Sequence, residues 1–307
     1  MPARHQPPQL PHLTSADDCI IRLHGMTTTT RPISSHGRFL WYELATTDTA
    51  AAKAFYTAVV GWSTQDASMP GQYYALFVAK GVPVGGLMQL PEEASRSGFR
   101  PAWLGYVGVD DVDQAAEQVE RLGGAVHVPP KEIPGISRLA VAVDPQMATI
   151  ALLKWLEPAP QPPGDLSAPG RVGWHELIAA DWEAAWAFYG NLFAWQKAQA
   201  ETGAVGTYQM FCADGLTMGG MYTKPATVTV PFWLYYFNVG DIDAAVTRVK
   251  AGGGRILNAP VAVPGGNWIV HCNDPQGAMF ALSGTRRHEG IGYFERAAPR
   301  SERAKAS

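Results

Sequence analysis

The stretch from Trp41 to Trp62 reads WYELATTDTAAAKAFYTAVVGW, and the stretch from Trp174 to Trp195 reads WHELIAADWEAAWAFYGNLFAW. The two align without a gap, from a Trp-x-Glu-Leu start through an Ala-Phe-Tyr centre to a final Trp. Further landmarks repeat at an offset of about 130 residues: Gly85-Gly86 with Gly219-Gly220, Trp103-Leu104-Gly105-Tyr106 with Trp233-Leu234-Tyr235-Tyr236, Gly123-Gly124 with Gly253-Gly254, and Asp144-Pro145-Gln146 with Asp274-Pro275-Gln276. A repeat of this length indicates a duplicated domain.

Each copy also divides into two similar units. In the first unit, residues 39–44 alternate like a strand, Asp48 is a good N-cap, residues 50–60 follow helical spacing, and strand patterns come next. The other three units repeat this order of strand, helix and further strands. We therefore predict an α+β fold, in which four βαβββ modules pair into two domains with curved sheets. A curved, half-open sheet favours ligand binding on its concave face.

The domain boundaries follow from composition. We expect a disordered N-terminal extension over residues 1–36, a first domain over 37–157, a proline-rich linker over 158–170, a second domain over 171–285 and a C-terminal tail over 286–307. Each domain is long enough to bury a core of its own.

Composition narrows the class of partner. With 47% hydrophobic residues, 17% charged residues and a formal net charge of -3, the chain is typical of a soluble globular protein with no reason to bind nucleic acid or membrane. The three cysteines lack CxxC spacing, which favours a reducing compartment and hence the cytoplasm. Ten Trp and eleven Tyr favour a small-molecule ligand. The protein is expected to be a monomer or a homodimer.

The pattern resembles the vicinal oxygen chelate superfamily, which includes glyoxalase I, the extradiol dioxygenases and the bleomycin-resistance proteins. The resemblance rests on the phrase from Leu44 to Tyr56, on Val109-Asp110-Asp111-Val112-Asp113 and on Asp144-Pro145-Gln146, all repeated in the second copy. The Trp-x-Glu-Leu strand in tandem domains is similar to an actinobacterial branch of antigens and hydroxylases. The resemblance implies glyoxalase-like domains.

Metal-dependent members of that superfamily bind a divalent cation through His, Gln or Glu at four strand positions. The resemblance places these positions on residues that cannot coordinate a metal: Trp41, Leu104, Ala151 and a site near Gly86 in the first domain, and Trp174, Leu234, Ala281 and a site near Gly220 in the second. We therefore expect no metal and no other cofactor. A shifted register that used Glu43, His175 and Glu176 is the one route to a metal site.

Glu43 and Glu176 are the candidate catalytic residues. Strand alternation puts each carboxyl group on the same face as Trp41 or Trp174, where desolvation would raise its pKa and suit it to proton transfer. The alternative is a structural carboxylate that is bonded to a backbone amide or to an Arg. His175 is expected to face the helices or the other domain. An isolated strand histidine of this kind is more often structural than catalytic.

Six residues are candidates for ligand binding. They are expected to line the concave faces with aromatic walls and polar tips: Trp41, Tyr106, Arg138, Trp174, Tyr236 and Trp268. Arg138 would suit the first face to an anionic group. The alternative is that these rings fill the interior of each domain.

Three functions remain open at this point. The first is a metal-independent protein that binds a small organic molecule, with or without acid–base chemistry at Glu43 or Glu176. The second is a metal-dependent lyase or dioxygenase, and the third is a non-catalytic interaction module whose concave faces are filled by their own Trp and Tyr. Whether the protein is an enzyme is left open by the sequence.

Overall fold

The computed structural model describes residues 35–69, 71, 73–96, 98–156, 165–203 and 206–286. Residues 1–34 of the predicted extension, residues 158–164 of the predicted linker and the predicted tail beyond residue 286 lie outside this set. Among the described helices, none is both long and apolar enough to cross a membrane.

The first half of the chain forms an eight-stranded sheet with the order β2-β3-β4-β1-β5-β8-β7-β6. Its elements are β1 (Phe39–Thr46), α1 (Thr49–Val60), β2 (Ser63–Asp66), β3 (Tyr74–Ala79), β4 (Val82–Gln89), α2 (Glu92–Arg96), β5 (Ala102–Gly108), α3 (Val112–Arg121), β6 (Ala125–Ile133), β7 (Ser137–Val143) and β8 (Thr149–Trp155). Strand β1 pairs parallel with β4 and antiparallel with β5, so the two modules join at the middle of the sheet.

The second half forms a nine-stranded sheet with the equivalent order β10-β11-β12-β9-β13-β17-β16-β14, and β15 pairs with β16. Its elements are β9 (Val172–Ala179), α4 (Trp182–Phe193), β10 (Gln196–Gly203), β11 (Gly206–Ala213), β12 (Leu216–Thr223), β13 (Phe232–Val239), α5 (Ile242–Ala251), β14 (Arg255–Ile256), β15 (Val261–Ala262), a 3₁₀ turn (Pro264–Gly266), β16 (Trp268–Asn273) and β17 (Met279–Gly284). The predicted α+β fold of four paired βαβββ modules is confirmed.

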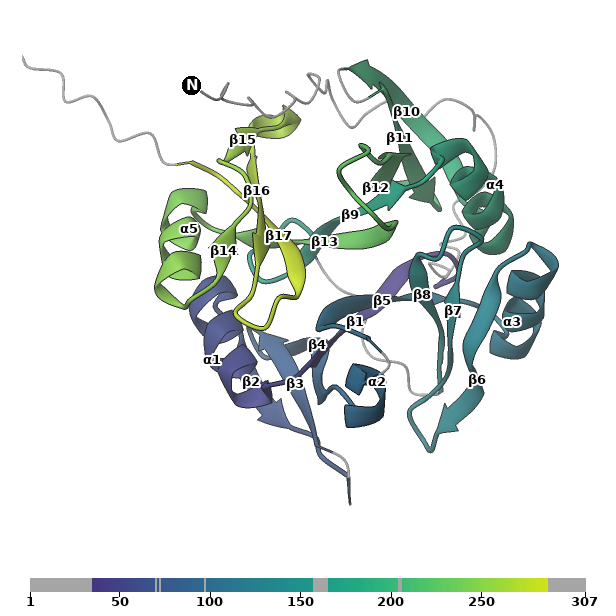
Figure 1. The fold of residues 1–307 in the computed structure, drawn as a ribbon, viewed down its shortest axis with the longest axis horizontal. Coiled ribbons are helices and arrows are strands. Elements are labelled where there is room, and N and C mark those ends of the chain that lie inside the picture. Colours follow the sequence, from purple (N-terminus) through teal and green to yellow (C-terminus); the bar gives the residue numbers. More distant parts are fainter. Residues whose placement is uncertain are drawn as a thin grey trace, which may run out of the picture.

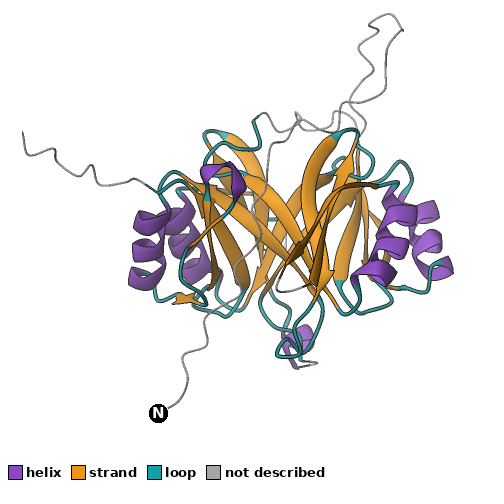
Figure 2. Cartoon of the chain, turned by 90° about the horizontal axis from the view of Figure 1, so that it is seen from above, coloured by secondary structure: helices purple, strands orange, loops and turns teal. Residues whose placement is uncertain are grey.

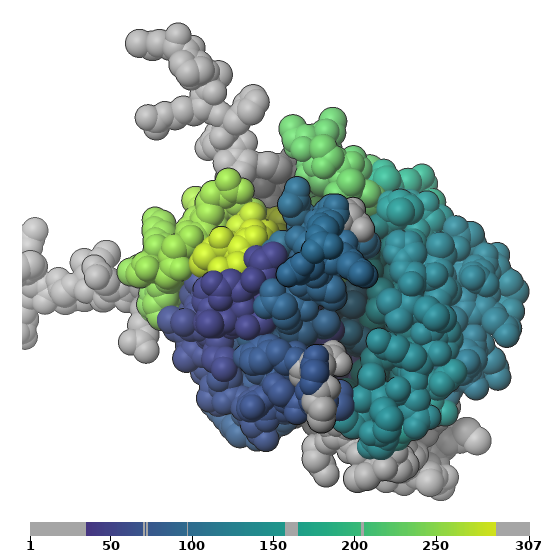
Figure 3. Space-filling model, turned by 60° about the horizontal axis from the view of Figure 1, so that its bottom comes forward, coloured from purple at the N-terminus to yellow at the C-terminus, as the bar shows by residue number. Residues whose placement is uncertain are grey.

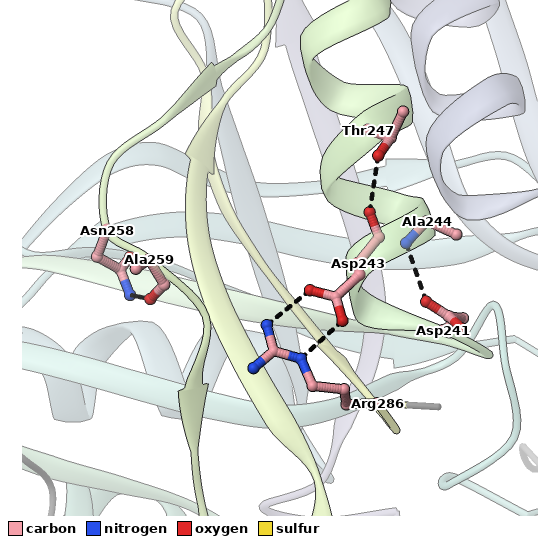
Figure 4. A network of polar contacts seen from close by, with 7 residues as sticks. All are labelled: Asp241, Asp243, Ala244, Thr247, Asn258, Ala259 and Arg286. Atoms are coloured by element: carbon pink, nitrogen blue, oxygen red, sulfur yellow. Dashed lines mark hydrogen bonds and ion pairs between the residues drawn. The ribbon is translucent and has the colours of Figure 1, made fainter. Parts of the chain in front are cut away.

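The four long helices begin in the same way. An Asp side chain accepts a hydrogen bond from a backbone N–H of the first turn at Asp48, Asp111, Asp181 and Asp241, the last of which is drawn in Figure 4. Each bond satisfies one of the amides that a helix start leaves without a partner.

The two sheets share one core. Helix α1 lies beside α5, and α3 lies beside α4 (Figures 1 and 3). The helix pairs flank the molecule on two sides with the strands between them (Figure 2). One continuous cluster of buried side chains includes residues of both halves, for example Phe55 packed edge-on against Phe280. The halves therefore do not bury separate cores, in contrast to the expectation from length.

The repeated landmarks of the sequence hold the halves together. The Tyr56 hydroxyl donates to Asp274 Oδ2 at 3.1 Å, and the equivalent Tyr189 donates to Asp144 Oδ2 at 3.0 Å. Each Asp-Pro-Gln turn is thus a binding site for the Ala-Phe-Tyr helix of the other half. These phrases recur because the same interface is formed twice.

Candidate functional site

The face of each sheet that points away from the shared core carries most of the candidate residues. In the first sheet this face is built around Tyr106, Ala151 and Leu153, with Trp41 packed beside them. We call it the first cup. In the second sheet it is built around Tyr236, Ala281 and Ile269, with Trp174 packed beside them. We call it the second cup.

Glu43 is held in the first cup by two tyrosines. Its carboxylate accepts hydrogen bonds from the Tyr74 hydroxyl at 2.8 Å and the Tyr106 hydroxyl at 3.0 Å. The indole N–H of Trp41 donates to the Tyr74 oxygen at 3.2 Å. Burial raises the pKa of Glu43, while the two tyrosine hydrogen bonds and the Lys131 ammonium oppose that rise.

Glu176 is held in the same way in the second cup, but deeper. Its side chain is buried, with 5% of the residue surface exposed. The Tyr236 hydroxyl donates to its Oε2 at 2.9 Å, Tyr208 supplies a second hydrogen bond, and the indole N–H of Trp174 donates to the Tyr208 oxygen at 2.8 Å. Burial raises the pKa of Glu176 to about 7 against the effect of both tyrosines.

A histidine extends the hydrogen-bond chain of the second cup. His271 Nε2 lies 3.0 Å from the Tyr236 oxygen, and burial lowers the pKa of His271 to about 4. Since a hydroxyl carries one proton, Tyr236 donates either to Glu176 or to His271 and accepts from the other. The direction of the Tyr236 hydroxyl therefore couples the hydrogen bonding of Glu176 to that of His271. The position equivalent to His271 in the first cup is Val141, since Val141 pairs with Ala151 as His271 pairs with Ala281. The hydrogen-bond chain of the first cup therefore ends at Tyr106.

The cups differ in the space they enclose. A cavity of about 510 Å³ opens onto the second cup. Its wall includes Trp174, Glu176, Glu201, Tyr208 and Tyr236. In the first cup, Trp155 packs perpendicular to Trp41 with ring centres 5.9 Å apart. The hollow beside these two rings measures about 60 Å³, too small for an organic ligand.

Tyr74 and Tyr208 were missed by the sequence analysis. Each leans across a strand and covers a glycine, so that a Cβ atom at Gly86 would lie 1.9 Å from the Tyr74 hydroxyl and one at Gly220 would lie 2.2 Å from the Tyr208 ring. The available signal was spacing, because each tyrosine precedes its glycine by the same number of residues in both copies.

The residues of the cups do not fit a divalent metal ion. Three of the four superfamily ligand positions hold Trp, Leu and Ala in both halves, and the space at the fourth is taken by Tyr74 or Tyr208. No group of three or more His, Cys, Asp and Glu side chains in the described residues is placed to hold a metal. Oxygen, nitrogen or thiolate ligands in such number are what these cations need.

The shifted register does not form either. His175 faces the other half, as expected, with its Nε2 2.5 Å from the Tyr42 hydroxyl and its Nδ1 2.7 Å from the Met218 carbonyl oxygen. The Met218 carbonyl fixes the proton on Nδ1, so Tyr42 donates to Nε2. Glu43 and Glu176 lie on different sheets, so His175 joins neither of them in a metal site.

The prediction that Arg138 and Trp268 line the cups is wrong. The Arg138 guanidinium forms two 2.6 Å hydrogen bonds with Asp113 of α3. Trp268 lies under the guanidinium of Arg286, at 3.9 Å from its ring centre, and Arg286 pairs with Asp243 of α5 (Figure 4). Both residues are on the helix side because the alternate positions, those of Val141 and His271, face the cups. Trp41, Tyr106, Trp174 and Tyr236 lie on the cups as predicted.

Comparison with known proteins agrees with this architecture. The family described as the Glyoxalase/Bleomycin resistance protein/Dioxygenase superfamily matches residues 38–152 and 171–282. The chain is 31% identical over 244 residues to "Putative glyoxylase CFP32" of Mycobacterium tuberculosis, covering 79% of this chain and 92% of that protein. It is also 31% identical over 255 residues to the anthracycline biosynthesis protein DauV of Streptomyces sp., covering 79% and 91%.

Solved structures show the same fold at low sequence identity. The Mn(II)-bound glyoxalase from Novosphingobium aromaticivorans superimposes with a TM-score of 0.56 at 16% identity, covering 82% of this chain and 83% of that one. The halotolerant catechol dioxygenase BphC gives a TM-score of 0.54 at 12% identity, covering 82% and 88%. With both halves matched by the family and close relatives spanned almost end to end, the chain belongs to the glyoxalase/bleomycin resistance protein/dioxygenase superfamily.

Proposed function

We propose that the second cup binds a small, planar organic molecule and exchanges a proton with it through Glu176, without a metal ion. The observation that carries this proposal is the cavity of about 510 Å³ whose wall contains the Glu176 carboxyl group. Its volume lies within the range of small-molecule sites. The Trp174, Tyr208 and Tyr236 rings supply flat apolar walls against which a planar ligand can stack.

Glu176 is suited to acid–base work by its surroundings. A carboxyl group with a pKa of about 7 is partly protonated at neutral pH, so it can both accept and donate a proton. Tyr208 and Tyr236 fix the orientation of the carboxyl group. The contact of Tyr236 with His271 gives the Tyr236 hydroxyl a second partner, so that it can stay hydrogen-bonded in both protonation states of Glu176. We propose that Glu43 has a structural role, because the hollow beside Trp41 and Trp155 in the first cup is too small for an organic ligand.

The relatives do not agree on a substrate, since one is named for glyoxylase activity and another for anthracycline biosynthesis. The metal-dependent lyase or dioxygenase alternative has support from the solved structures of similar fold, but it lacks ligands in either cup. The non-catalytic alternative is favoured for the first cup, where Trp155 packs against Trp41 and the hollow beside the two rings measures about 60 Å³.

The test combines native mass spectrometry with a matched pair of variants. We expect the purified protein to carry no stoichiometric divalent metal and to bind one organic ligand per chain. Once a ligand that is turned over has been found, Glu176→Gln should abolish turnover, whereas Glu43→Gln should leave it near the wild-type value. One divalent metal ion per domain, or full activity in Glu176→Gln, would overturn the proposal.

A further inference from the structure

Among the described residues, the charged side chains that line the cavity are all acidic. Of the described residues that line it, three are acidic (Glu176, Glu201 and Asp165), and none is Lys or Arg. Asp165 is exposed at the rim, whereas Glu176 and Glu201 are buried in the wall. An anionic ligand would meet repulsion without a compensating cation in this wall.

The second carboxylate is specific to the open cup. Glu201 is paired with Tyr208 across strands β10 and β11, and residues paired in this way project from the same face of a sheet. The equivalent position in the first half is Ala67, whose backbone N–H bonds to the Tyr74 carbonyl. Both halves keep the Glu–Tyr–Tyr arrangement, but only the half with the cavity adds Glu201.

Several hydrogen-bond donors of the wall are engaged within the protein. The Tyr236 hydroxyl donates within the Glu176–His271 chain, and the Trp174 N–H is used by the Tyr208 oxygen. The amide N–H group of Asn238 donates to the Leu166 carbonyl. The wall also includes Thr217, Asn267 and Ser283, whose side chains can donate or accept hydrogen bonds. The carboxyl groups and the aromatic faces attract N–H donors and positive charge, and the rings add cation–π attraction.

We propose that the ligand of the second cup is an arylalkylamine, bound as its ammonium ion between the carboxyl groups of Glu176 and Glu201. This inference rests on the proposed binding function of the second cup and adds the ligand's charge class. A bound ammonium group would place a positive charge and N–H donors beside the acidic side chains of the wall. The aromatic part of the ligand stacks on the Trp174 and Tyr208 rings.

The test uses three probes of one shape and three charges, namely naphthylmethylammonium, naphthylmethanol and naphthoate. Isothermal titration calorimetry at slightly alkaline pH should give an affinity that is about tenfold or more higher for the ammonium than for the alcohol, as expected for a charge-assisted hydrogen bond. Naphthoate should not bind. Glu201→Gln and Glu201→Ala should both lose most of the preference for the ammonium. Glu120→Gln, which removes an exposed carboxylate on α3, should keep it.

The outcomes separate the two proposals. If naphthoate binds as tightly as the ammonium, or if both Glu201 variants keep the preference, the charge class is wrong while the binding function stands. If none of the three probes binds at millimolar concentration, the binding function fails and this inference fails with it.

Discussion

The two cups are built on the same arrangement and differ in what surrounds it. Both hold a Glu between two tyrosines, with a Trp bonded to one of them. The replacements from the first cup to the second include Leu40 to Gly173, Ala67 to Glu201, Val141 to His271, Leu153 to Ser283 and Trp155 to Thr285. Three of these remove bulk, and two add ionisable groups.

The shared arrangement has a structural role that does not depend on a ligand. In the first cup, the Glu–Tyr–Tyr–Trp hydrogen bonds link neighbouring strands although the hollow beside Trp41 and Trp155 measures only about 60 Å³. Three of the replacing residues, Gly173, Glu201 and Ser283, line the cavity. Substitutions at the replaced positions therefore test the proposed function.

The largest effect is expected when the second cup is given the bulk of the first. The double substitution Ser283→Leu/Thr285→Trp should fill the cavity and reduce binding of naphthylmethylammonium below detection in calorimetry. The fold should persist, because the first cup already accommodates Leu153 and Trp155 at the same positions. Wild-type affinity in this variant would show that the ligand binds elsewhere.

The next effect concerns stability against pH. The pKa of Glu176 is raised in the fold from 4.5 to about 7, so between these values the folded state holds more protons than the unfolded state. Stability therefore falls as pH rises from about 4.5 to 7. Glu176→Gln should remove this loss and stabilise the protein at pH 8 by up to about 3 kcal/mol.

Urea unfolding at several pH values measures this difference. Glu43→Gln is the matched control and should show a smaller change, since Glu43 is only half-buried. Equal changes in the two variants would contradict the difference in burial between the cups.

Removing a tyrosine hydroxyl should also destabilise the protein more in the second cup than in the first. Tyr208→Phe removes a hydrogen bond to a buried carboxyl group and should cost about 2 kcal/mol of unfolding free energy at neutral pH. Tyr74→Phe, at the half-buried Glu43, should cost about 1 kcal/mol. Thermal and urea unfolding of the two variants would test the ranking, and a larger cost for Tyr74→Phe would reverse it.

The smallest predicted effect is a change in the pKa of Glu176 when His271 is replaced. His271→Val copies Val141 of the first cup and removes the acceptor that Tyr236 uses when Glu176 is protonated. Both forms lose the contact with the imidazole, but only the protonated form leaves the buried Tyr236 O–H without an acceptor, so the pKa of Glu176 should fall by up to about one unit. Infrared titration of the carboxyl band measures it. An unchanged pKa would show that His271 does not share the proton.

The sequence was sufficient for the fold because the duplication tests each pattern twice. An Asp before each helix and strand patterns of matching order predicted the modules. The same comparison placed Glu43 and Glu176 beside Trp41 and Trp174.

The sequence-based prediction was wrong for Arg138 and Trp268 because both faces of β7 and β16 are largely apolar. Alternation therefore does not indicate which side faces the cup. Tyr74 and Tyr208 were missed because each reaches its Glu diagonally over a glycine, a contact that strand alternation does not predict. The cavity depends on side-chain volumes contributed by several strands and by Leu166 before β9, and a linear pattern does not sum these.

The crossed tyrosine contacts also constrain how this chain folds. Tyr56 and Asp274 are 218 residues apart, and their hydrogen bond forms only after both sheets are in place. Long sequence separation between contacting residues slows folding, and one shared core favours a single cooperative transition. Each half alone would expose the surface that its twin covers. The halves are therefore suited to fragment complementation, in which two separately expressed chains assemble without a peptide link between them.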